Sequence, residues 1–134
     1  MTVVSDWALV CEQAYFDVEQ SESLSLSRII EQAVVETLPA SIGPFVIVVH
    51  LDGYGERMRV GLRATRPDGS LAALDEKHVS FDHVGPYLLF RISHLEVLAE
   101  GRYRFDIIFD DVYVARTVSL SVLRASHDAV DIVH

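Results

Sequence analysis

The chain is poor in cysteine, because Cys11 is the only one among its 134 residues. A single cysteine can form no internal disulfide and offers no thiolate metal site. Cys11 lies in the apolar stretch 7–16, and no lysine or arginine stands beside it that would lower the pKa of its thiol. We therefore expect a buried, unreactive thiol.

Basic residues are also scarce. Lysine and arginine together number 11 against 20 acidic residues, so the net charge is −9 at pH 7. Nucleic-acid binding normally starts from a basic patch. The arginines at 57–66 and at 102–104 instead alternate with apolar residues, as on the solvated face of a strand. The composition thus predicts neither nucleic acid nor an anionic membrane surface as a partner.

Long apolar runs are absent. The longest, such as Phe45–Val49, hold about five residues, whereas a membrane-spanning helix needs roughly 20. Residues 1–15 lack the basic start and apolar centre of a secretory signal, because Asp6 and Glu12 interrupt them. We therefore expect a cytoplasmic protein with no transmembrane segment.

Catalytic and metal-binding motifs of recognisable spacing are missing as well. The chain has no G-x-S-x-G elbow, no Cys–His signature and no D-x-D-x-D-G calcium loop. Its six histidines match no metal-ligand spacing, although His50 and Asp52, or His78 and Asp82, would share one face of an extended strand. We predict a protein that is not an enzyme and has no cofactor. Metal binding by loop acids or histidines stays an open alternative.

The chain is rich in period-two alternation, most regularly in Gly101–Leu123. The apolar residues of its first half occupy alternate positions, as in a strand with one face in a core: Tyr103, Phe105, Ile107 and Phe109. Asp110 and Asp111 interrupt the pattern with turn chemistry, and alternation resumes from Val112 to Val122. This stretch predicts a hairpin of two long antiparallel strands.

Other segments predict further strands. Phe45–Leu51 is a nearly continuous apolar run and the most deeply buried candidate. Leu24–Glu36 fits either a helix or a strand; its β-branched residues favour a strand, and 28–38 stays open between the two. Strand patterns also cover Trp7–Phe16, Arg57–Thr65, Leu71–Leu74, Val79–Phe81 and Tyr87–Ile92.

Seven or eight short strands separated by regular turn signals are typical of two antiparallel sheets over one core. We predict an all-β protein, an antiparallel β-sandwich of immunoglobulin-like type. A closed or jelly-roll barrel is the alternative. The 134 residues predict a single domain, in which 125–134 form a C-terminal tail.

Three blocks together resemble an uncharacterised family of small stand-alone bacterial domains: ALVCEQAYF…SLSLSRII, LPASIGPFVIVVHLDG with its RPDG turn, and GRYRFDIIFDDVYVARTVSL. The third is also similar to the closing strands of immunoglobulin- and fibronectin-like domains, in which a tyrosine hydroxyl returns to the backbone. The resemblance implies a β-sandwich in a bacterial, intracellular setting. It implies no catalytic residues.

The functional hypothesis is a non-enzymatic interaction module that binds protein through loops or an open edge strand and self-associates as a homo-oligomer. Tyr54, Tyr87 and Tyr113 lie at or beside predicted turns and are candidate contacts. Ile132 and Val133 of the tail complete the predicted interaction surface. The alternative is a small-ligand or metal-binding β-barrel protein, with His50 or His78 in its pocket.

Overall fold

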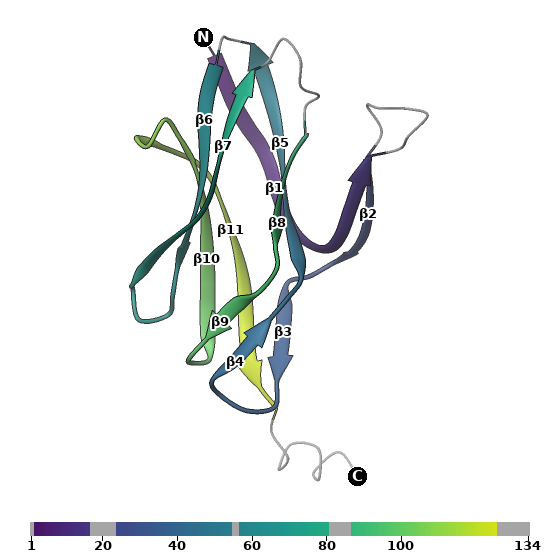
Figure 1. The fold of residues 1–134 in the computed structure, drawn as a ribbon, viewed down its shortest axis with the longest axis vertical. Coiled ribbons are helices and arrows are strands. Elements are labelled where there is room, and N and C mark those ends of the chain that lie inside the picture. The colour runs from purple at the N-terminus through teal and green to yellow at the C-terminus, as the bar shows by residue number, and fades with distance from the viewer. Residues whose placement is uncertain (1, 17–23, 55–56, 81–86, 126–134) are drawn as a thin grey trace.

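The computed structural model describes residues 2–16, 24–54, 57–80 and 87–125 (Figure 1). These residues form strands, turns and irregular segments, so the prediction of an all-β protein is confirmed. None of them belongs to a helix with the length and hydropathy that a membrane crossing needs.

The described residues form eleven strands: β1 (Thr2–Phe16), β2 (Leu24–Ile29), β3 (Gln32–Val35), β4 (Ala40–Ile42), β5 (Phe45–Tyr54), β6 (Arg57–Thr65), β7 (Leu71–Ser80), β8 (Tyr87–Ile92), β9 (Leu95–Val97), β10 (Gly101–Phe109) and β11 (Tyr113–Arg124). A four-stranded sheet has the order β2-β1-β5-β8, and a five-stranded sheet has the order β3-β11-β10-β6-β7. The short strands β4 and β9 pair with each other. Figure 1 places β6, β7 and β10 on one side of the molecule and β5 and β8 beside them.

The two main sheets pack over one hydrophobic core and do not close into a single sheet, which confirms the predicted sandwich. The pairs are antiparallel, except that β3 runs parallel to the last strand, β11. The alternating residues of the first strand of the predicted hairpin face the core, which they share with the inward side of β5: Phe45, Ile47, Val49, Leu51, Tyr103, Phe105, Ile107 and Phe109. In the second half, Leu120 and Val122 are buried as predicted, but Val112 and Val114 are exposed. Val112 lies in the turn, and Val114 lies beyond a register shift between β10 and β11.

The strand count exceeds the seven or eight predicted. The stretch 24–36 forms strands and no helix, but the chain leaves the four-stranded sheet after Ile29 and joins the five-stranded sheet at Gln32, so it makes two strands. Ala40–Ile42 pairs with β9 inside a segment rich in proline and glycine. Leu71–Ser80 is one strand with a bulge opposite Leu62 and Arg63, where two separate pieces were predicted.

The tyrosine corner expected from the resemblance to immunoglobulin-like domains is present. The hydroxyl of Tyr103 donates a hydrogen bond of 2.8 Å to the carbonyl oxygen of Ala99, four residues earlier. Tyr103 is 1% exposed, so this contact satisfies a phenol that would otherwise be buried without a partner. The bond fixes the path by which the chain enters β10.

Replacing Tyr103 by phenylalanine removes this bond and leaves the Ala99 carbonyl without the phenol. We expect Tyr103→Phe to lower the free energy of unfolding by about 1–2 kcal/mol, measured by urea unfolding. Tyr113→Phe is the matched control, because Tyr113 is 59% exposed. Equal stabilities of the two variants would contradict the role assigned to the corner.

Candidate functional site

The outer face of the four-stranded sheet carries an ordered array of side chains. Trp7, His50 and Tyr87 are directly opposite one another on β1, β5 and β8, so they form one row across three strands. Their rings are in contact: Trp7 stacks on His50 with 5.4 Å between centroids and 9° between planes. The rings of His50 and Tyr87 meet edge to face, with 5.1 Å between their centroids.

Two further rows follow along the same strands. Val48 lies between Leu9 and Leu89, and Val46 lies between Cys11 and Arg91. We call these nine residues the apolar face: Trp7, Leu9, Cys11, Val46, Val48, His50, Tyr87, Leu89 and Arg91. Arg91 is its one charged member, and its Nη1 donates to the carbonyl oxygen of Ala14 at 3.1 Å.

The middle strand of the apolar face is buried although it lies on the outside of the sandwich. Val48 is 0% exposed and Val46 is 5% exposed. They form a second apolar cluster with Cys11 and Ala14, against which Trp7, Leu9, Tyr87 and Leu89 pack. These flanking side chains stay partly exposed. Val46 and Val48 are thus buried beneath residues that solvent still reaches, while His50 at the end of the same strand stays partly exposed.

Cys11 belongs to this cluster, as a buried thiol at 0% exposure. Burial raises the pKa of the Cys11 thiol, while the charge of Arg91 opposes this shift. The predicted buried cysteine is therefore observed, in an environment that disfavours the thiolate.

A β-bulge brings an acid to the aromatic row. The register of β1 against β5 shifts between Ser5 and Trp7, and Asp6 accepts a hydrogen bond there from Nδ1 of His50. The carbonyl of Ser5 accepts two bonds from the guanidinium of Arg116 on β11, at 2.5 and 3.1 Å. Arg116 therefore ties the bulge to the other sheet and holds Asp6 beside His50.

The contact with His50 lowers the pKa of the Asp6 carboxyl below its ordinary value of 3.8, outweighing the opposing effect of desolvation. A carboxylate with a lowered pKa stabilises the fold at pH values above 3.8, and this contribution disappears as the pH falls through the lowered pKa. The Asp6–His50 pair thus fixes the imidazole in the row at neutral pH.

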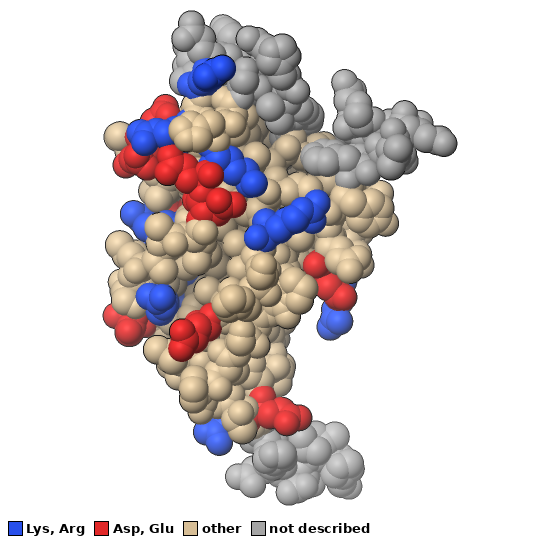
Figure 2. Space-filling model, in the orientation of Figure 1, with Lys and Arg blue, Asp and Glu red and all other residues tan. Residues whose placement is uncertain are grey.

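The outer face of the five-stranded sheet is different in character, because charged side chains cover it. Arg59 pairs with Asp111 at 2.9 Å and Arg63 pairs with Asp106 at 3.1 Å. Thr117 also donates to Asp106 at 2.8 Å. In Figure 2, blue and red atoms gather over the side where Figure 1 places β6 and β7, while the middle of the view is mostly tan. The two outer faces therefore offer different surfaces to a partner.

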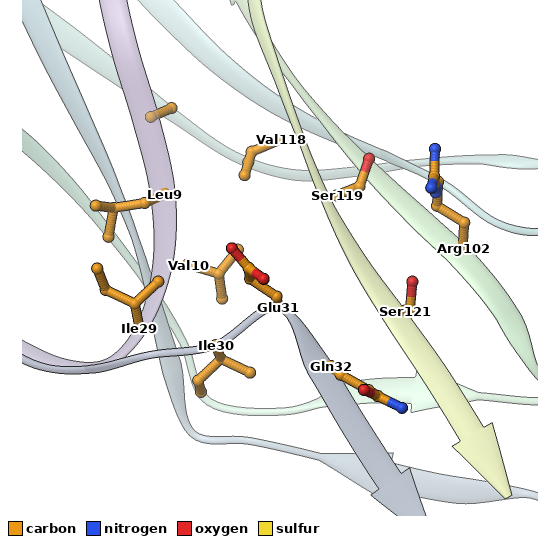
Figure 3. A pocket seen from close by; sticks show the side chains of 11 residues that line it. Leu9, Val10, Ile29, Ile30, Glu31, Gln32, Arg102, Val118, Ser119 and Ser121 are labelled. Carbon is orange, nitrogen blue, oxygen red and sulfur yellow. The ribbon is translucent and has the colours of Figure 1, made fainter.

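A groove lies where β1 and β11 separate (Figure 3). Its volume is about 470 Å³. Apolar side chains of β1 and β2 line one end, serines of β11 and Arg102 line the other, and Glu31 and Gln32 lie between them (Figure 3). Neither His50 nor His78 lines this groove. Among the residues described, no group of three or more His, Cys, Asp or Glu side chains is placed to hold a metal ion.

The predicted interaction residues do not come together as one surface. Tyr87 lies in the aromatic row, whereas Tyr113 lies at the start of β11 in the other sheet, 6.2 Å from the Phe109 ring. Tyr54 ends β5, and its side chain is outside the described part of the structure. Ile132 and Val133, with the predicted tail, also lie outside the described residues.

Sequence reasoning missed Trp7, His50 and Leu89 as members of one site. Each was visible as a strand residue, and the alternation in Phe45–Leu51 and Tyr87–Ile92 separates inward from outward positions. The missing information was the register between distant strands, which decides which outward residues face each other.

No protein-family model matches the chain, and no curated protein sequence is significantly similar to it. The resemblance to small bacterial domains therefore stays a prediction.

Replacing His50 by phenylalanine keeps a ring in the row but removes the donor to Asp6. We expect the titration midpoint of the Asp6 carboxyl, followed by NMR, to rise toward 3.8 in His50→Phe. Asp68 is an internal control, because hydrogen bonds from Ser70 lower its pKa at a separate turn. An unchanged Asp6 midpoint, or a parallel shift of Asp68, would contradict the assigned cause.

Proposed function

We propose that this chain is a non-enzymatic interaction module that binds a protein partner through the apolar face. The observation that carries the proposal is the row of Trp7, His50 and Tyr87, whose rings are in contact on a side of the sheet that no other described strand covers. Tryptophan and tyrosine are enriched among residues that dominate binding energy, because they offer large apolar contacts with few rotatable bonds. A bacterial, cytoplasmic setting is part of the same proposal.

The shape of the face supports a protein partner. Three strands about 4.8 Å apart and five residues at about 3.3 Å each span roughly 10 by 13 Å between outermost Cα atoms. Such a patch is smaller than the roughly 800 Å² that each partner contributes to a standard interface. Its size suits the apolar centre of an interface, around which a partner would make polar contacts. Small-ligand or metal binding stays the alternative prediction.

Charge also favours this face over the opposite one. The chain carries a net charge of −9, yet the apolar face contains no acid, and Asp6 at its border is paired with His50. A partner that docks there leaves the ion pairs of the five-stranded sheet in water. Removing those charges from water would cost free energy, most of all where a charge lost its partner. Of the two outer faces, the apolar face is therefore the one that an uncharged partner patch can cover with the smaller desolvation penalty.

Introducing a charge into the row tests the proposal. We expect Trp7→Lys to lose at least about tenfold in the amount of a specific protein captured from the native host, as expected for a hot-spot aromatic residue. Quantitative mass spectrometry on immobilised protein measures this. The matched control is Val114→Lys, which places the same charge on an exposed apolar residue of β11, in the other sheet.

Before comparison, circular dichroism must show that both variants keep the strand signal of the wild type. Partners captured equally by Trp7→Lys and by the wild type would reject the apolar face as the binding surface. So would partners lost only with Val114→Lys.

A further inference from the structure

The two main sheets have four edge strands, β2, β8, β3 and β7, and in the described residues no strand pairs with their far sides. Natural proteins protect such edges with bulges, inward charges, shortness or irregular backbone. β7 has a bulge and points Lys77 inward over the ring of Phe90, 5.7 Å from its centroid. β3 has four residues, and β2 contains Arg28 with a φ of 54°.

β8 has none of these protections within Tyr87–Ile92. It has six residues, YLLFRI, without proline or lysine, and its register against β5 is regular. Its only charged side chain, Arg91, turns across the apolar face to the carbonyl of Ala14. An unprotected, apolar edge strand of this length is suited to pairing with another strand.

The hydrogen bonds of neighbouring strands show which backbone groups face this edge. The carbonyl of Val10 accepts a bond from the amide of Ile30, so it points away from β5. Ile47, opposite Val10, then directs its amide and carbonyl toward Phe90 on β8. Since backbone directions alternate along a strand, the amides and carbonyls of Tyr87, Leu89 and Arg91 point to the open edge.

The outward amides and carbonyls of Tyr87, Leu89 and Arg91 can pair with the same groups on a second copy of the strand. We propose that β8 pairs antiparallel with β8 of a second copy of this chain, with the two-fold axis at Leu89. Leu89 then faces Leu89 of the second copy, and Tyr87 faces Arg91. All outward backbone groups meet in this register, giving about six hydrogen bonds between the copies. This proposal goes beyond the proposed function and does not depend on any partner of the apolar face.

Side chains favour the same register. This register places Arg91 opposite the uncharged Tyr87, whereas a register with Arg91 opposite Arg91 would place like charges face to face. Leu88 meets Phe90 on the core side, and Leu89 meets its own copy on the outer side. The two four-stranded sheets then form one continuous sheet, and the apolar faces of both copies lie side by side.

The test is sedimentation velocity on the full chain, from low to high micromolar concentration. We expect a reversible monomer–dimer equilibrium that tightens with added salt, because each copy carries a net charge of −9. Leu89→Pro removes the central outward amide and should weaken the dimer at least about tenfold, since the two-fold axis repeats the loss. A wild-type chain that stays monomeric at every concentration and salt level overturns the proposal.

Leu71→Pro is the matched control. Leu71 is the first residue of another of the four edge strands, β7, a position where proline is tolerated. The amide of Arg66 donates to the carbonyl of Ser70, so the amide of the next residue, Leu71, points away from β6. Dimerisation should match the wild type in Leu71→Pro; a dimer broken by Leu71→Pro and kept by Leu89→Pro overturns the proposal.

A charge exchange keeps the test decisive if Leu89→Pro fails to fold. Leu89→Lys and Leu89→Asp each place like charges at the two-fold axis, so each should be monomeric. Their mixture should form a heterodimer, because lysine then faces aspartate. A mixture that stays monomeric, or single variants that dimerise as the wild type does, overturns the register. Trp7→Lys should leave the dimer intact, which separates this proposal from the function proposed for the apolar face.

Discussion

Burial on both sides of β5 is the constraint on which the rest of this structure depends. One side, with Ile47 and Val49, packs against the five-stranded sheet. The other side, with Val46 and Val48, has no second layer among the described residues, and the flanking strands cover it with their own side chains. A sheet of this kind normally exposes a polar outer face. Here the strand at its centre requires an apolar one.

The aromatic row follows from this requirement together with a local irregularity. The β-bulge at Asp6 changes the register of β1, and Arg116 fixes the bulge from the opposite sheet. His50 is held in its place in the row by Asp6 on one side and by ring contacts on the other. The bulge and its contacts therefore position the candidate binding residues. The sheet that carries these residues ends at the unprotected edge strand β8. Both proposals thus concern one sheet.

Much of the fold could be predicted because side-chain burial alternates along a strand. The hairpin 101–123, the buried strand 45–51 and the corner at Tyr103 all have signals within one short segment. The site could be predicted only in part. Tyr87 was identified, but its neighbours Trp7 and His50 depend on long-range register and on a bulge, neither of which leaves a local pattern. Tyr113 looked equivalent to Tyr87, yet it lies in the other sheet.

The most direct test of two-sided burial compares Val48→Ala with Val49→Ala. The two residues are adjacent, each is 0% exposed, and they point to opposite sides of β5. If the apolar face is a true buried layer, both substitutions should lower the free energy of unfolding by about 2 kcal/mol, measured by urea denaturation. A normal loss for Val49→Ala with almost none for Val48→Ala would show that the outer side of β5 is not a packed layer, and the proposal of an apolar binding face would fail with it.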